Sequence, residues 1–63
     1  MSSRFIVEAE SGAVGIALRC SGGYRFFASA QAFRALERRI FPRLRALLQA
    51  VRTLDRTLRS SRA

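Results

Sequence analysis

The sequence predicts an α+β fold, in which a three-stranded antiparallel β-meander is followed by one long amphipathic α-helix. Two observations support this fold class. Three short segments of alternating apolar and polar residues come first, separated by turns that contain glycine and serine. After Ser29, apolar residues recur at helical spacing. We therefore expect the 63 residues to form a single small domain, with the meander over 1–28, the helix over 29–60 and a frayed tail at 60–63.

The turns set the register of the meander. A two-residue turn at Ser11–Gly12 and a three-residue turn at Ser21–Gly23 bring the apolar residues of all three strands to one face. A two-residue turn at Gly22–Gly23 would move Arg25 to the inward face, so we reject it. The expected strands are 4–10, 13–20 and 24–28. The inward-facing residues are then Phe5, Val7, Ala9, Val14, Ile16, Leu18, Cys20, Tyr24 and Phe26.

The same register places arginines on the outer face of the sheet. Arg4, Arg19 and Arg25 form a row across the three strands, and Phe27 belongs to the next row. Like charges directly opposite each other repel, and an exposed aromatic ring offers a stacking surface for nucleic-acid bases. We therefore interpret this face as a candidate contact surface. The alternative is that the three side chains splay into solvent.

The helix has a suitable start and one interruption. Ser29 is a candidate N-cap, because its hydroxyl oxygen can accept a hydrogen bond from the free amides of the first turn. Pro42 removes a backbone hydrogen bond and should kink or break the helix. The apolar stripe keeps its phase across Pro42, which favours one kinked helix over two separate helices.

A helix over 29–60 is too long for the domain that carries it. It extends about 45 Å, whereas a compact domain of this size is about 27 Å across. Its second half therefore carries surplus apolar residues, which favours a homo-oligomer, most simply a two-fold dimer. The alternatives are a fold-back at Pro42, a foreign protein partner and, less favoured, a membrane surface. The expected interface residues are Leu44, Leu47, Leu48, Val51, Leu54 and Leu58.

The positive charge is concentrated in the second half. The net charge is +8, and nine of the twelve arginines follow residue 28. Asp55 could pair with Arg52 or Arg59, and Glu37 with Arg34, which leaves most guanidinium groups to attract phosphate. The arginines that share an arc of about 60° on the wheel are Arg34, Arg38, Arg45, Arg52, Arg56 and Arg59. The candidate nucleic-acid-binding residues are Arg4, Arg19, Arg25, Phe27, Arg38, Arg45 and Arg52.

Composition argues against an enzyme. The chain has no histidine and a single cysteine, Cys20, so a catalytic thiolate would lack its usual base. The sequence also lacks metal-ligand spacing and a glycine-rich phosphate loop. We expect no catalytic residue, cofactor or metal, and we expect Cys20 to be a small apolar core residue. The sequence contains neither a secretory signal nor a membrane span, which predicts a soluble cytoplasmic protein.

The predicted layout, with Arg4, Arg19 and Arg25 on the sheet, is similar to that of plant ethylene-response and integrase arm-type DNA-binding domains. The resemblance covers element order and arginine placement, whereas the sequence motifs of those families are absent. It implies DNA contact through the exposed sheet face. The sequence thus predicts a small basic binding or assembly protein that forms a homo-oligomer through its C-terminal helix and contacts nucleic acid through arginines. The alternatives are a protein interaction module without nucleic-acid affinity and a peripheral membrane binder.

Overall fold

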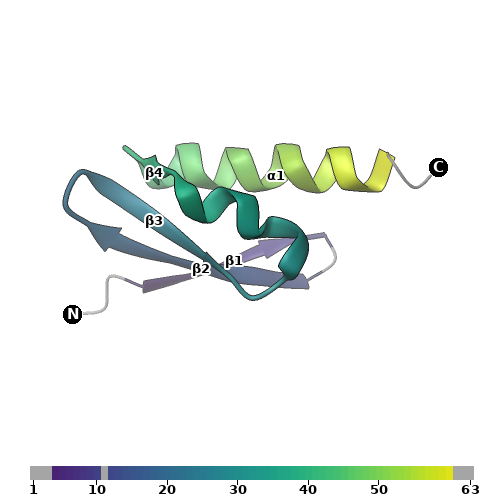
Figure 1. The fold of residues 1–63 in the computed structure, drawn as a ribbon, viewed down its shortest axis with the longest axis horizontal. Coiled ribbons are helices and arrows are strands. Elements are labelled where there is room, and N and C mark those ends of the chain that lie inside the picture. The colour runs from purple at the N-terminus through teal and green to yellow at the C-terminus, as the bar shows by residue number, and fades with distance from the viewer. Residues whose placement is uncertain (1–3, 11, 61–63) are drawn as a thin grey trace.

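A computed structural model shows a four-stranded antiparallel sheet with all helical segments on one side (Figure 1). The structure describes residues 4–10 and 12–60. The strands lie in the order β1-β2-β3-β4, and a 3-10 helix, η1, and an α-helix, α1, cover one face. The α+β class is confirmed, with a β-meander followed by a C-terminal helix. In chain order the elements are β1 (Arg4–Ala9), β2 (Gly12–Cys20), β3 (Gly23–Ala28), η1 (Gln31–Arg38), β4 (Ile40–Phe41) and α1 (Leu44–Ser60).

The core lies between the sheet and the two helical segments. Phe33 and Leu36 enter it from η1, and Leu47 and Val51 enter it from α1. Because these four residues are spaced three or four apart on their own helices, each helical segment presents one apolar side to the sheet. The sheet and its edge contribute Val7, Val14, Ala17, Phe26 and Phe41.

The predicted single helix over 29–60 is wrong. The 3-10 segment ends at Arg38, the chain becomes extended, and Ile40 and Phe41 pair with β3 before α1 begins at Leu44. Pro42 favours this extended conformation in the residue before it and cannot donate to a helix. The chain then reverses, so that α1 runs back over η1 and the sheet (Figure 1). Of the alternatives at Pro42, the fold-back is the one that the structure shows.

The expected helix start at Ser29 is also wrong. Ala30 occupies the cap position of η1, and no side chain caps it. The backbone N–H groups of Ser29 and Ala30 both donate to the carbonyl oxygen of Val14, at 2.8 and 3.2 Å. The chain that leaves β3 is therefore tied back to β2 through its backbone.

Both strand registers differ from the predicted ones. Cys20 lies opposite Gly23, so the second turn is the two-residue turn Ser21–Gly22, and Leu18 lies opposite Arg25. In the first pair, Val7 lies opposite Gly15 and Glu8 opposite Ala13, which leaves Val14 as a β-bulge. The first turn includes Ser11, which lies outside the described residues.

Because of these register differences, most side chains of β2 lie on the face of the sheet opposite to the predicted one. Ala17 is fully buried, whereas Ile16 and Leu18, both predicted to face inward, lie on the opposite face of the strand. The bulge lets Val14 remain buried although Ile16 is not inward. A shift of one residue moves every following side chain to the other face of a strand. Here it places Ala17 in the core and Ile16 and Leu18 on the outer face.

Gly15 makes room for the largest core side chain of the sheet. A Cβ atom on Gly15 would meet the carbonyl oxygen of Phe27 and would lie 2.6 Å from the ring of Phe26. Phe26 itself is fully buried. The aromatic ring can therefore lie flat over β2 only because Gly15 has no side chain.

We expect Gly15→Ala to lower the free energy of unfolding by about 1–3 kcal/mol, because the new methyl group overpacks the core beside Phe26. Thermal denaturation followed by circular dichroism measures this change. The control is Ala13→Val, which adds more volume at an exposed position of the same strand and should change stability by less than about 0.5 kcal/mol. Equal stability of both variants would contradict the close packing over Gly15.

Candidate functional site

The predicted arginine row across the sheet does not form. Arg4 and Arg25 both lie opposite Leu18, whereas Arg19 lies opposite Tyr24. Arg19 therefore belongs to the other face of the sheet, and Leu18 takes its place in the row. Arg4 and Arg25 remain on the outer face as predicted, separated by β2, so that the unfavourable juxtaposition of like charges is avoided.

The outer face of the sheet is apolar and uncovered. Ile6, Ile16 and Phe27 form one row across β1, β2 and β3. Leu18 on β2 and Ile40 on β4 belong to a second row, in which Arg25 on β3 lies between them. Ile6 is 72% exposed, Ile40 52% and Phe27 41%. The guanidinium carbon of Arg25 lies 6.0 Å from the centre of the Phe27 ring. We define the open sheet face as Arg4, Ile6, Ile16, Leu18, Arg25, Phe27 and Ile40.

Helix α1 carries four exposed arginines along one flank, three of them beside the end of β1. Arg45 and Arg52 were predicted as nucleic-acid contacts, and Arg56 and Arg59 lie in the same arc. We define the α1 arginine face as Arg45, Arg52, Arg56 and Arg59. Arg34 and Arg38 were expected on the same stripe, but η1 is a separate 3-10 segment, so its arginines do not continue this face.

Only one residue of the α1 arginine face is engaged by acidic groups. Arg59 Nε lies 3.3 Å from Asp55 Oδ2, and Arg59 Nη1 donates to Glu10 Oε1 at 3.0 Å. Of the two partners predicted for Asp55, Arg52 and Arg59, the structure shows Arg59. Within residues 4–10 and 12–60, Arg45, Arg52 and Arg56 have no carboxylate within ion-pair distance. Their charge is therefore available to an external anion.

The predicted partnership of Glu37 with Arg34 is not what the structure shows. Glu37 Oε2 accepts a hydrogen bond from the backbone N–H of Ala28 at 2.8 Å. The carboxylate thus ties η1 to the end of β3. A hollow of about 890 Å³ beside it is bordered by Arg25, Arg34 and Arg38, which brings together two of the predicted nucleic-acid contacts, Arg25 and Arg38.

The apolar residues of α1 are largely turned toward the protein's own sheet. Leu47 and Val51 are buried, and Leu44, Leu48, Leu54 and Leu58 are half-buried against the same core. The self-association predicted through these six residues stays a prediction. Because the chain folds back at Pro42, its own sheet buries part of the apolar surface of α1 that a second helix was expected to bury.

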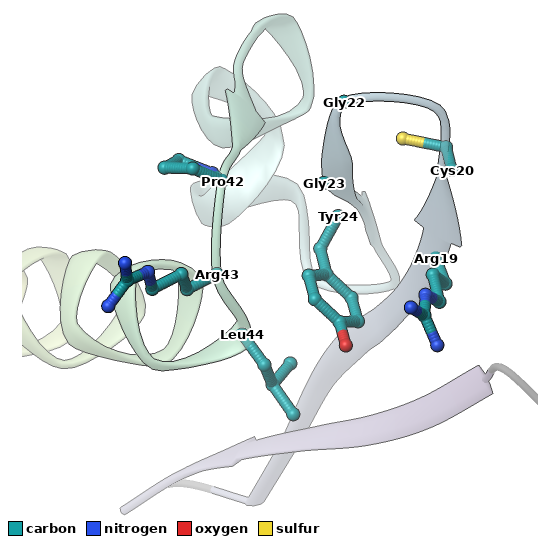
Figure 2. A pocket seen from close by; sticks show the side chains of 8 residues that line it. All are labelled: Arg19, Cys20, Gly22, Gly23, Tyr24, Pro42, Arg43 and Leu44. Carbon is teal, nitrogen blue, oxygen red and sulfur yellow. The ribbon is translucent and has the colours of Figure 1, made fainter.

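A further hollow lies at the β2–β3 turn, but its charged groups do not converge. It measures about 490 Å³ and is bordered by Arg19, Tyr24 and Arg43. In Figure 2, Arg43 points away from Arg19 and Tyr24. Cys20 also borders this hollow; it is half-buried and outside the core cluster, contrary to the expectation of a core residue.

The described part of the chain contains no group of three or more His, Cys, Asp or Glu residues placed to hold a metal ion. No helix within this part is long and apolar enough to span a membrane. Comparison of the chain with protein-family models, curated proteins and solved structures finds no match. The candidate sites are therefore those that the geometry defines, the α1 arginine face and the open sheet face.

We expect Arg59→Gln to lower the free energy of unfolding by about 1 kcal/mol, because it leaves the buried Asp55 carboxylate without its cationic partner. Chemical denaturation measures the change. Arg56→Gln is the matched control, one turn away on the same face and without an acidic partner, and should change stability by less than about 0.5 kcal/mol. Equal losses in both variants would show that the Asp55–Arg59 contact contributes nothing of its own.

Proposed function

We propose that this protein is a small non-enzymatic nucleic-acid-binding protein whose α1 arginine face contacts the phosphate backbone. The observation that supports this proposal is the row of exposed arginines along α1, of which Arg45, Arg52 and Arg56 lack an acidic partner within the described residues. The guanidinium groups of Arg45, Arg52 and Arg56 lie on one side of the helix and repel each other, and bound phosphates relieve that repulsion through paired hydrogen bonds.

The dimensions of the α1 arginine face suit a nucleic-acid backbone. From Arg45 to Arg59 the helix rises about 21 Å, which corresponds to about six base pairs of duplex at 3.4 Å each. Phosphates occur at regular intervals along that length. Contacts of this kind confer affinity without sequence preference, so the proposed binding is non-specific.

The packing of α1 favours nucleic acid over a membrane surface. A helix that lies on a membrane inserts an exposed apolar side into the lipid. In α1 the apolar side faces the sheet, with Leu47 and Val51 buried. Next to the arginines the exposed residues are Gln49 and Thr53. The arginine face therefore offers mainly charge and hydrogen bonds, because Leu44 and Leu48 beside Arg45 and Arg52 are half-buried against the core.

The first arm of the test measures the binding of a fluorescent random-sequence DNA duplex by anisotropy at several salt concentrations. Three phosphate contacts, from Arg45, Arg52 and Arg56, give a slope of log Kd against log salt concentration of about 2.7, which is a loss of roughly 40-fold in affinity between about 50 and 200 mM salt. Anionic vesicles serve as a second ligand. Absence of duplex binding at 50 mM salt, or binding to vesicles alone, would contradict the proposal.

The second arm locates the contact on the protein. The triple variant Arg45→Gln/Arg52→Gln/Arg56→Gln should lower the slope to near zero, because it removes all three phosphate contacts. The matched control is Arg34→Gln/Arg38→Gln/Arg43→Gln, which removes the same charge from exposed positions outside the α1 arginine face. This control should retain most of the slope. If both triple variants lowered the slope by the same amount, net charge rather than the α1 arginine face would determine the binding of the duplex.

A further inference from the structure

We propose that the open sheet face is covered by a second copy of this chain, packed sheet against sheet in a two-fold dimer. The α1 arginine face belongs to a different element, along the flank of α1 beside β1, so the inference goes beyond the proposed nucleic-acid contact and does not depend on it. It replaces the helix-mediated oligomer that the sequence predicted with one that uses a different surface of the same domain.

The chemistry of the open sheet face points to burial by protein. Its five apolar residues are mostly aliphatic, and Ile6 and Ile40 expose more than half of their surface. Soluble monomers rarely leave contiguous patches of this kind in water. Branched aliphatic side chains neither stack on bases nor bind phosphate, whereas they interdigitate well between two packed sheets.

The size of the face fits a weak symmetric dimer. Six paired residues of a strand span about 20 Å, and four strands span about 19 Å. Two such faces of about 380 Å² each bury about 760 Å² in total, which is below the size of stable specific interfaces and in the range of weak, transient ones. We therefore expect a dissociation constant in the micromolar range, with monomer and dimer both populated at laboratory concentrations.

Charge complementarity favours a second copy as the partner. Along β1, Arg4, Ile6 and Glu8 alternate with Phe5 and Val7, so the two charged residues lie on either side of Ile6 on one face. We place the two-fold axis between the two sheets, along the row formed by Ile6, Ile16 and Phe27. Each strand of one copy then packs against the same strand of the other copy, and the two strands run in opposite directions. Arg4 of one copy then lies opposite Glu8 of the other, and this pair occurs twice.

The test is sedimentation equilibrium of the full chain between about 1 and 300 µM, without nucleic acid. We expect a reversible monomer–dimer equilibrium. Ile6→Glu should raise the dissociation constant at least about tenfold, because Ile6 faces its own copy at the axis, and its high exposure in the monomer lets the fold tolerate the change. A monomeric wild-type protein at 300 µM would overturn the proposal.

Charge reversal tests the arrangement itself. Glu8→Arg should weaken the dimer, because it places two cations opposite each other, and Arg4→Glu/Glu8→Arg should restore the wild-type dissociation constant. Leu48→Gln on α1 is the control for a helix-mediated oligomer and should leave the dimer intact. A dimer that is lost in Leu48→Gln but retained in Ile6→Glu would overturn the sheet-to-sheet arrangement.

Circular dichroism of each variant confirms that it is folded, and duplex binding by folded Ile6→Glu separates failure of this inference from failure of the proposed function.

Discussion

The pairing of the short strand β4 with β3 is the contact on which the rest of the architecture depends. Phe41 lies opposite Tyr24 and is 2% exposed, so the chain enters the core at the sheet edge before α1 begins. Gly23 permits this approach, because a Cβ atom there would overlap the carbonyl oxygen of Phe41. Pro42 follows at once and supports the extended backbone from which α1 turns back over the sheet.

The reversal determines which surfaces are left for binding. With α1 and η1 both on one side of the sheet, no element within residues 4–10 and 12–60 covers the other side. The open sheet face therefore keeps its apolar residues in contact with solvent, while the arginines of α1 lie along the flank of that helix, beside the end of β1. The two proposals follow from this separation of an apolar surface from a basic one.

The two proposed interactions are compatible in one assembly. A sheet-to-sheet dimer would place both α1 helices on the outside, where their positive charges are far apart and screened by solvent. The assembly would then present two basic surfaces, one on each outer layer. Each copy contributes its own arginines, so neither binding surface is shared or blocked by the dimer contact.

The fold class, the approximate strand positions, the amphipathic character of α1 and the exposure of Phe27 on the outer face were all predictable from the sequence, as was an ion pair of Asp55 with either Arg52 or Arg59. These features depend on local periodicity, on turn glycines and on neighbours one helical turn apart. Only the tertiary structure decided that Arg19 leaves the outer face, that Ile16 and Leu18 join it, and that the helix is broken before Leu44. Alternation of period two fits two registers equally well, and the choice between them came from contacts distant in sequence. These contacts are the ring of Phe26 over Gly15, the bulge at Val14 and the burial of Phe41.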